Sequence, residues 1–311
     1  MNIRHLRYFV ALARERNHTR AAAACHVTQP TLTEAIRQLE RDLAVPLIDR
    51  KGQRFGGLTP EGDRVLVWAQ RILADEDALG QELAEMREGL SGDLRFGIIP
   101  AAMPVVPLIT NPFFDRYPHV TLRLLSHTSI EIQRGLDDGI LEAGLTYLDN
   151  EPLRNVRTVP LYRERYMLLT PTGGRFDGMK AVSWREAAKL PLCLLTRNMQ
   201  NRRIIDRLFS EAGASPNVAI ETNSVVAFVA HVRSGRWSSV IPHTFMGLLG
   251  NADATLSGLN AVPLVEPETS QTIGLVLSER DPLPPLARAM LKSVRETDLS
   301  RAIELAVTRA P

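Results

Sequence analysis

The sequence predicts a multi-domain α/β protein with an N-terminal winged helix-turn-helix (residues 1–59), a long coiled-coil linker helix (60–91) and a C-terminal two-lobed α/β domain (92–311). Three observations predict this fold class. The first 59 residues are basic, residues 60–90 form one helical pattern, and short apolar strands alternate with helical stretches after residue 92. The length of 311 residues fits two or three domains of roughly 100–200 residues each.

Composition excludes several classes of protein. Hydrophobic residues make up 44% and charged residues 23%, which is ordinary for a globular chain and excludes disorder and fibrous repeats. No apolar run approaches the ~18 residues of a membrane span, and the start lacks the features of a signal peptide. Cys25 and Cys193 have no CxxC partner, which argues against a disulfide or a zinc site and fits a reducing cytoplasm. We therefore expect a cytoplasmic protein without metal or cofactor.

Three short helices are predicted in residues 1–59. An apolar stripe predicts a helix over 3–14, and Thr19 is a candidate cap for a second helix of small residues that follows. After the break at "HVTQ", Thr28 is a good N-cap for a third helix, and Pro30 is tolerated in its first turn. A tight turn before a third helix is typical of the helix-turn-helix, and the segment "LIDRKGQRFGGLT" indicates a β-hairpin wing.

A long helix is predicted from Pro60 to Leu90, ended by Gly89 and Gly92. Its heptad positions are apolar with the exception of Glu76. The helix could pack this seam against its own domain, but its length and its place between two domains favour a dimer. The candidate dimerisation residues are Val65, Ala69, Ile72, Leu79, Leu83 and Met86.

After residue 92 the pattern changes to α/β. Strand candidates are "LRFGIIP", "VTLRLLS", "LEAGLTY", "YMLLTP", "LCLLT" and "TIGLVLS", with helices near 129–138, 201–212, 224–234 and 283–296. Such alternation predicts parallel sheets covered on both faces. We expect one lobe over about 92–163 plus 267–297 and another over about 164–266. The two crossings, near 163–165 and 266–270, would then form a hinge.

Charge is unevenly distributed along the chain. Residues 1–59 carry ten Lys and Arg against five acids, whereas the whole chain has a net charge of only +2. A basic head on a mildly acidic body suggests that the head binds a polyanion such as nucleic acid. An Arg-rich solvated surface would give the same charge, so charge alone leaves both interpretations open.

The motifs of the head are specific enough to indicate a family. The sequence resembles the LysR-type transcriptional regulators in Ala21-Ala22, Val27-Thr28-Gln29-Pro30, Leu32-Thr33, Ile36, Leu39-Glu40, Leu43, Leu47-Ile48, Arg50, Thr59 and Gly62. The segments "GDLRFGIIP" and "GLDDGILEAGL" look like the effector-binding domain of that family. Cys25, Ile48 and Ala44 depart from the pattern only in packing or turn positions.

The resemblance implies both an architecture and a role. The C-terminal domain would have a periplasmic-binding-protein-like (type 2) fold, and the protein would assemble into a homotetramer as a dimer of dimers. It would bind double-stranded DNA at an interrupted palindrome and control a nearby, often divergent, operon, with RNA polymerase as a further partner. A small-molecule effector would control it.

The third helix of the head supplies the candidate DNA contacts. A recognition helix reads bases with its N-terminal residues in the major groove, where the Gln29 amide can pair with adenine. Pro30, Thr31 and Thr33 can touch thymine methyls or phosphates, and Glu34 could accept from cytosine or remain solvated. Phosphate contacts would position the protein without reading sequence. Any one residue could be an ordinary exposed side chain; the complete candidate set is Thr28, Gln29, Pro30, Thr31, Thr33, Glu34, Arg37, Arg50, Lys51 and Arg54.

Loops at the carboxyl ends of strands supply the candidate effector site, because helix N-termini there offer N–H donors. Such donors suit a small anionic or hydroxylated ligand, with Arg197 or His127 as a counter-charge. Thr128 and Ser129 could equally be helix caps, and backbone N–H groups would replace the hydroxyls that relatives often carry at Ala101 and Ala102. The candidate residues are Pro100, Ala101, Ala102, His127, Thr128, Ser129, Thr196, Arg197, Asn198 and Asn223.

Other functions are weighed against regulation. The sequence has no P-loop, no G-x-G-x-x-G, no G-x-S-x-G and no H-E-x-x-H, so we expect no catalytic residues and no enzyme. A small-acid-binding protein or an enzyme built on the two-lobed domain is the alternative, and the basic head argues against it. Because helix N-termini supply donors and positive potential, the expected effector is a small organic acid or anion. The segment "GRWSSVIPHTF" resembles regulators beside formate-metabolism genes, which makes formate metabolism one candidate.

Overall fold

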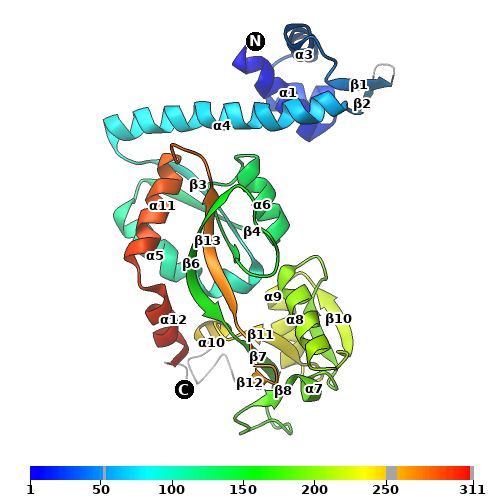
Figure 1. Cartoon of the computed structure of the whole chain (residues 1–311), viewed down its shortest axis with the longest axis vertical. Helices are drawn as coiled ribbons and strands as arrows, with labels where there is room; N and C mark the ends of the chain where they lie inside the picture. The colour runs from blue at the N-terminus through cyan, green and yellow to red at the C-terminus, as the bar shows by residue number, and fades with distance from the viewer. Residues whose placement is uncertain (52–53, 250–257, 309–311) are drawn as a thin grey trace. The chain divides into compact units, whose positions relative to one another are not determined.

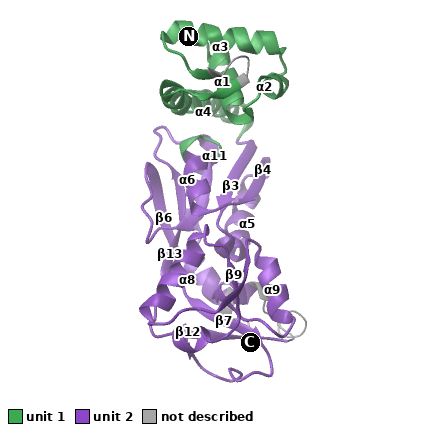
Figure 2. Ribbon diagram, turned by 90° about the vertical axis from the view of Figure 1, so that its right-hand side faces the viewer, with its two compact units in different colours: residues 1–89, 137–140 green, residues 90–136, 141–311 purple. Residues whose placement is uncertain are grey.

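The structure, a computed structural model, describes residues 1–51, 54–249 and 258–308 (Figure 1). The chain divides into two compact units. Residues 1–89 together with 137–140 form the first, and residues 90–136 with 141–311 form the second (Figure 2). None of the described helices is both long enough and apolar enough to cross a membrane.

The first unit contains the predicted helix-turn-helix and its wing. Helices α1 (Ile3–Glu15), α2 (His18–Ala24) and α3 (Gln29–Leu43) precede an antiparallel hairpin of β1 (Ile48–Lys51) and β2 (Arg54–Leu58). Thr28 caps α3 as expected. The expectation for Thr19 was wrong, because Asn17 caps α2 by accepting from the Arg20 amide. The core of this unit is made by Leu6, Phe9, Leu12, Ala21, Leu32, Ile36, Leu39 and Leu47.

The linker helix α4 runs from Pro60 to Glu88, capped by the Thr59 hydroxyl, which accepts from the Gly62 amide. Its predicted seam divides into two halves. Ala69 is fully buried in the core of the first unit, and Val65 and Ile72 pack against that core. Leu79, Leu83 and Met86, by contrast, are 60%, 50% and 80% exposed. The helix therefore packs on its own unit at one end and leaves an apolar surface at the other.

The second unit contains two groups of strands. The first is a five-stranded sheet in the order β4-β3-β5-β13-β6. Its strands are β3 (Gly92–Ile98), β4 (Val120–Ser126), β5 (Ala143–Tyr147), β6 (Val156–Glu164) and β13 (Gln271–Ser278). Its helices are η1 (Pro100–Val105), α5 (Val106–Arg116), α6 (Ser129–Asp137), α11 (Pro285–Glu296) and α12 (Leu299–Thr308).

The second group of strands follows from residue 166. β7 (Tyr166–Pro171), β8 (Val182–Ser183), β11 (Ser239–Pro242) and β12 (Leu259–Val265) form a sheet in the order β11-β7-β12-β8. The parallel pair β9 (Leu192–Leu195) and β10 (Val218–Thr222) joins it through a bridge between Leu192 and Ser238. The helices of this part are α7 (Trp184–Ala187), α8 (Gln200–Glu211), α9 (Val225–Arg233) and α10 (Phe245–Leu249).

The expectation of purely parallel sheets was wrong. β3 pairs in parallel with β4 and β5, but β13 pairs antiparallel with both β5 and β6. β7 is likewise antiparallel to β11 and β12. The physical reason is the double crossing: the chain leaves the first sheet after β6 and re-enters it as β13, between two strands already in place.

A buried polar cluster lies where β6 passes into β7. Glu164 is fully buried and its Oε1 accepts a hydrogen bond of 2.6 Å from the Tyr147 hydroxyl. That hydroxyl in turn accepts from the Asn201 amide on α8, at 2.8 Å. Because Tyr147 lies on the first sheet and α8 follows β9 of the second group, this chain of hydrogen bonds ties the two parts together at a crossing.

Candidate functional site

The N-terminus of α3 is exposed at Thr28, Gln29, Pro30 and Thr31. The Thr28 hydroxyl accepts from the Thr31 amide and lies 2.8 Å from the Thr31 hydroxyl. Gln29 and Pro30 are exposed beside them, whereas Thr33 is half-buried. The partial positive charge of a helix N-terminus favours an anion at this end.

The Gln29 amide is oriented by its neighbour on α2. The Thr19 hydroxyl donates to Gln29 Oε1 at 3.3 Å. This contact uses one lone pair of the oxygen and leaves the amide N–H₂ group free to donate. A side-chain amide held in this way presents the donor and acceptor pair that reads an adenine edge. Thr19 thus orients Gln29, the candidate base-reading residue, and the sequence did not indicate this role.

The next turns of α3 carry charged side chains that pair with one another. Glu34 accepts from Arg41 at 2.6 Å and lies 4.0 Å from Arg37, and all three side chains are more than half exposed. The hydrogen bond from Arg41 holds the pKa of Glu34 below its ordinary value. These contacts compete with any contact from Glu34 to a base, whereas the Arg37 guanidinium remains accessible to a phosphate. The side chains of Arg50, Lys51 and Arg54 lie outside the described part of the chain.

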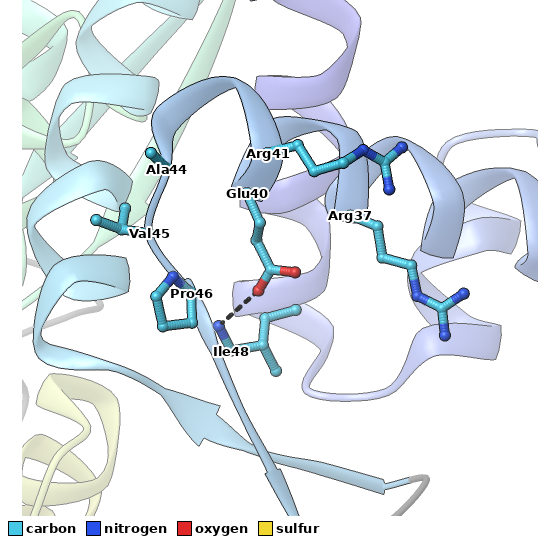
Figure 3. A pocket seen from close by; sticks show the side chains of 7 residues that line it. All are labelled: Arg37, Glu40, Arg41, Ala44, Val45, Pro46 and Ile48. Carbon is cyan, nitrogen blue, oxygen red and sulfur yellow. Dashed lines mark hydrogen bonds between the residues drawn. The ribbon is translucent and has the colours of Figure 1, made fainter.

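A pocket of about 570 Å³ lies between the end of α3 and the start of the wing (Figure 3). The Glu40 carboxylate points across it, and its Oε1 accepts from the amides of Leu47 and Ile48 at 3.0 and 3.4 Å. Arg37 and Arg41 project from the same helix, away from this bond. Glu40 therefore fixes the turn that connects the recognition helix to the wing. The sequence motif included Glu40, but nothing in the sequence indicated this role.

A larger cavity of about 1040 Å³ lies in the second unit between loops of both groups of strands. The loops that follow β3 and β4 contribute to one side, and the loops that follow β9 and β10 contribute to the other. We call this cavity the cleft. It is lined by Pro100, Met103, Ser126, His127, Thr128, Glu131, Thr196, Asn198, Met199, Glu221, Thr222, Asn223, Ser224, Val225 and Val226.

On the first side of the cleft, Thr128 and Glu131 form a reciprocal cap at the start of α6. The Thr128 hydroxyl accepts from the Glu131 amide, and the Glu131 carboxylate accepts from the Thr128 amide at 2.7 Å and its hydroxyl at 2.9 Å. The backbone hydrogen bond from Thr128 lowers the pKa of Glu131. His127 Nδ1 lies 3.8 Å from that carboxylate. The capping interpretation of Thr128 is confirmed, and its side chain borders the cleft as well.

On the second side of the cleft, polar groups surround the start of α9. Ser224 caps that helix by accepting from the Ala227 amide, and its own amide donates to the Thr222 hydroxyl. Across the loop after β9, the Thr196 hydroxyl donates to Asn198 Oδ1 at 2.6 Å, and Asn223 is exposed beside them. The arrangement offers amide and hydroxyl groups that can both donate to and accept from a small polar molecule.

The sequence-predicted effector residues separate into two groups. Pro100, His127, Thr128, Thr196, Asn198 and Asn223 lie together in the cleft lining. Ala101 and Ala102 are instead buried in the hydrophobic core, and Ser129 is 5% exposed with an Oγ that has no hydrogen-bond partner in the described structure. The Arg197 side chain is 79% exposed, lies outside the lining, and is 3.7 Å from Glu221.

Several lining residues were missed. Glu131 and Glu221 bring carboxylates to the cleft, and Met103, Met199 and Val226 bring apolar surface. Each of them lies within four residues of a predicted site residue, so the correct loops were identified without all of their inward-facing positions. The start of each helix was visible in the sequence, but the direction of each side chain was not.

Comparison with known proteins matches both the N-terminal and the C-terminal part of the chain to the same family. Residues 3–63 match the family described as "Bacterial regulatory helix-turn-helix protein, lysR family", and residues 87–298 match the "LysR substrate binding domain". A probable hydrogen peroxide-inducible genes activator of Mycobacterium avium is 30% identical over 273 residues, covering 87% of this chain and 86% of that protein. The DNA-binding transcriptional dual regulator OxyR of Escherichia coli K12 is 28% identical over 296 residues, 95% of each chain.

Solved structures show the same fold over nearly the whole chain. A cysteine-to-aspartate variant of full-length OxyR from Pseudomonas aeruginosa has a TM-score of 0.74 at 24% identity, with 97% of each chain covered. Full-length CbnR in complex with its target DNA has a TM-score of 0.66 at 24% identity, covering 96% of this chain and 100% of that one. At this identity the likeness establishes the fold alone.

Proposed function

This chain belongs to the LysR family of bacterial DNA-binding transcriptional regulators, and from that premise we propose which of its residues contact DNA and which contact the effector. The proposed division is a DNA-binding head over 1–59, a dimerisation helix over 60–91 and an effector-binding domain over 92–311. The observation that carries the proposal is that one chain contains both an N-capped α3 with an exposed first turn and a polar cleft at the carboxyl ends of strands.

Gln29 is the proposed base-reading residue. It is exposed at the N-terminus of α3, and its amide is oriented by Thr19. Pro30 and Thr31 would contact thymine methyls or phosphates, and Arg37 would contact a phosphate. Glu34 is left out of base reading, because Arg41 and Arg37 already pair with its carboxylate.

The proposed effector is a small polar molecule with at most one carboxylate. No Lys or Arg lies among the described residues that line the cleft, whereas Glu131 and Glu221 bring two carboxylates, of which Glu221 pairs with Arg202 at 2.8 Å. A ligand with several negative charges would be repelled, while hydroxyls or a single carboxylate could bond to Asn198, Asn223 and the N-terminus of α9. Since Arg197 lies outside the lining, we do not propose it as the counter-charge. None of the relatives described above is named for formate, so that hypothesis receives no support.

The names of the relatives raise the possibility of a peroxide response, which the cysteines of this chain do not support. A peroxide-sensing cysteine must be an accessible thiolate. Cys193 is fully buried in β9, and burial raises the pKa of its thiol. Cys25 is half-buried in the head, and burial raises the pKa of its thiol too. We therefore propose ligand binding, and not thiol oxidation, as the signal.

Two apolar surfaces support assembly into a dimer of dimers. Leu79, Leu83 and Met86 would pair along α4 with the same residues of a second chain. The edge strand β4 and helix α6 expose Leu124 and Ile130, 45% and 48% accessible, and we propose them for a second interface between effector domains.

DNA footprinting at several salt concentrations tests the proposed function. A two-fold dimer places two copies of α3 in successive major grooves, so protection should cover two inverted half-sites about 10 bp apart. With four or more phosphate contacts, the logarithm of affinity should fall by at least about 3.6 per tenfold increase in salt. A single asymmetric half-site bound without salt dependence would contradict the proposal.

A further inference from the structure

A second cavity of about 640 Å³ lies at the two crossings of the effector domain. We call it the hinge pocket. Arg163 and Arg165 line it from the first crossing, and Glu268, Thr269 and Ser270 line it from the second. His243, which follows β11, lines it as well. None of these residues belongs to the lining of the cleft, so the hinge pocket is a separate site.

Within the described part of the chain, the two arginines of the hinge pocket have no acidic partner. Successive residues of a strand face opposite sides, so Arg163 and Arg165 project away from the buried side chain of Glu164 between them. Both are exposed. Arg163 Nε donates to Ser270 Oγ at 2.7 Å, which joins the two crossings. Among the described residues neither guanidinium forms an ion pair, although the exposed Glu268 lines the same pocket.

His243 adds a nearly buried donor to the hinge pocket. It is 8% exposed and is held on the first crossing: its amide donates to the Arg165 carbonyl at 2.9 Å, and its Nδ1 accepts from the Arg165 amide at 3.1 Å. Burial, assisted by the charge of Arg165, lowers the pKa of His243 to about 4. The ring is therefore neutral near pH 7, with its proton on Nε2, since Nδ1 is an acceptor. In the described structure this Nε2–H donates to no protein group.

We propose that the hinge pocket binds a small oxyanion. Two guanidinium groups, the His243 Nε2–H and the hydroxyls of Thr269 and Ser270 are the donors that phosphate and carboxylate groups prefer. Two positive charges against the single carboxylate of Glu268 leave an excess of one, which suits a small anion. The occupant would be held by residues from both crossings at once.

Such a ligand would act on the hinge and thereby on the cleft. An oxyanion bridging Arg163 and Ser270 restrains the relative motion of the two crossings, because both contribute to its binding. If the restraint favours one arrangement of the lobes, the oxyanion and the effector change each other's affinity by the same factor. This coupling rests on the proposed effector cleft, whereas binding in the hinge pocket does not.

Calorimetry on the full-length protein tests the site, with inorganic phosphate and acetate as probes. We expect saturable binding of at least one of them. In Arg163→Gln/Arg165→Gln that binding event should weaken at least tenfold, because two charge-assisted contacts are lost. Arg157→Gln, on the same strand but outside the pocket, should bind as the wild type does. The phosphate and acetate arms distinguish a tetrahedral from a planar oxyanion.

Two further variants keep the test decisive. Ser270→Asp places a carboxylate beside Arg163 and should abolish binding while satisfying the arginine, even if the double variant folds poorly. Thr196→Ala/Asn198→Ala alters only the cleft and should leave this binding event unchanged. The proposal is overturned if neither probe binds, if the arginine variant binds like the wild type, or if only the cleft variant loses binding. In that last case the proposed cleft would gain support while the hinge pocket fails.

Discussion

Replacing Glu164 by Gln should reveal a buried acid that makes the effector domain less stable as the pH rises. Glu164 is fully buried at the β6–β7 crossing. Burial raises the pKa of its carboxyl from 4.5 to about 8, although the hydrogen bond from Tyr147 lowers it. Gln cannot ionise but can still accept from Tyr147, so the change removes the titration and keeps the contact.

The sign of this pH dependence follows from proton binding. Between about pH 4.5 and 8 the folded protein holds a proton on Glu164 that the unfolded chain has released, so the free energy of unfolding falls as pH rises. This contribution to stability is complete below pH 4.5 and is lost as pH rises through 8. His243 acts in the opposite sense: its pKa falls from 6.5 to about 4, so its contribution grows between pH 4 and 6.5 and offsets that of Glu164.

The window from pH 6.5 to 8 therefore isolates Glu164 from His243. Over these 1.5 pH units, at about 1.4 kcal/mol per unit, the free energy of unfolding should fall by roughly 2 kcal/mol in the wild type relative to Glu164→Gln. Urea unfolding followed by tryptophan fluorescence measures it, because Trp184 is buried and its ring centroid lies 5.9 Å from that of Tyr166. An exposed control, Glu211→Gln, should follow the wild-type curve. Parallel curves for wild type and Glu164→Gln would refute the reasoning.

Two further predictions concern DNA and assembly. Gln29→Ala should reduce discrimination at one base pair by about 1–3 kcal/mol, whereas Arg37→Ala should weaken binding to all DNA sequences alike and reduce the salt slope by about 1. Binding titrations on matched and mismatched operators separate the two effects, and identical binding profiles for the two variants would contradict the assignment. Leu79→Asp or Leu83→Asp would place an unpaired carboxylate in the proposed helix seam and should dissociate the dimer formed by α4, which light scattering detects. Asp77→Asn, a change on the same helix at an exposed position outside the predicted seam, is the control; a variant at Leu79 that assembles like the wild type would exclude this seam.

The head could be predicted in most of its detail because its signals are local. The Thr28 cap, the apolar stripe of α3 and the hairpin wing each depend on residues adjacent in sequence, and all three are present. Thr19 was assigned wrongly because Asn17, two residues earlier, is an equally good cap. The helix therefore begins at His18, before Thr19. Its actual contact, with Gln29, spans two helices and has no local signal.

The effector domain could be predicted only coarsely, because the order of its strands is set by contacts between residues far apart in the sequence. β6 was missed as a strand since its sequence includes Pro160 and two arginines, Arg157 and Arg163, and has no apolar run. The insertion of β13 between β5 and β6 depends on pairing across more than a hundred residues. The same limit applies to the cleft, where the loops were identified but the burial of Ala101 and Ala102 and the inward carboxylate of Glu131 depend on packing.

The central claim, that a small polar effector in the cleft controls operator binding, is tested most directly by one titration. Operator affinity of the full-length protein is measured against a panel of small monocarboxylic acids and hydroxylated compounds, for the wild type and for Thr196→Ala/Asn198→Ala. We predict that at least one compound changes the operator affinity or the footprint of the wild type, and that the cleft variant binds the operator normally but needs at least tenfold more compound. A variant that responds at the wild-type concentration would contradict the claim.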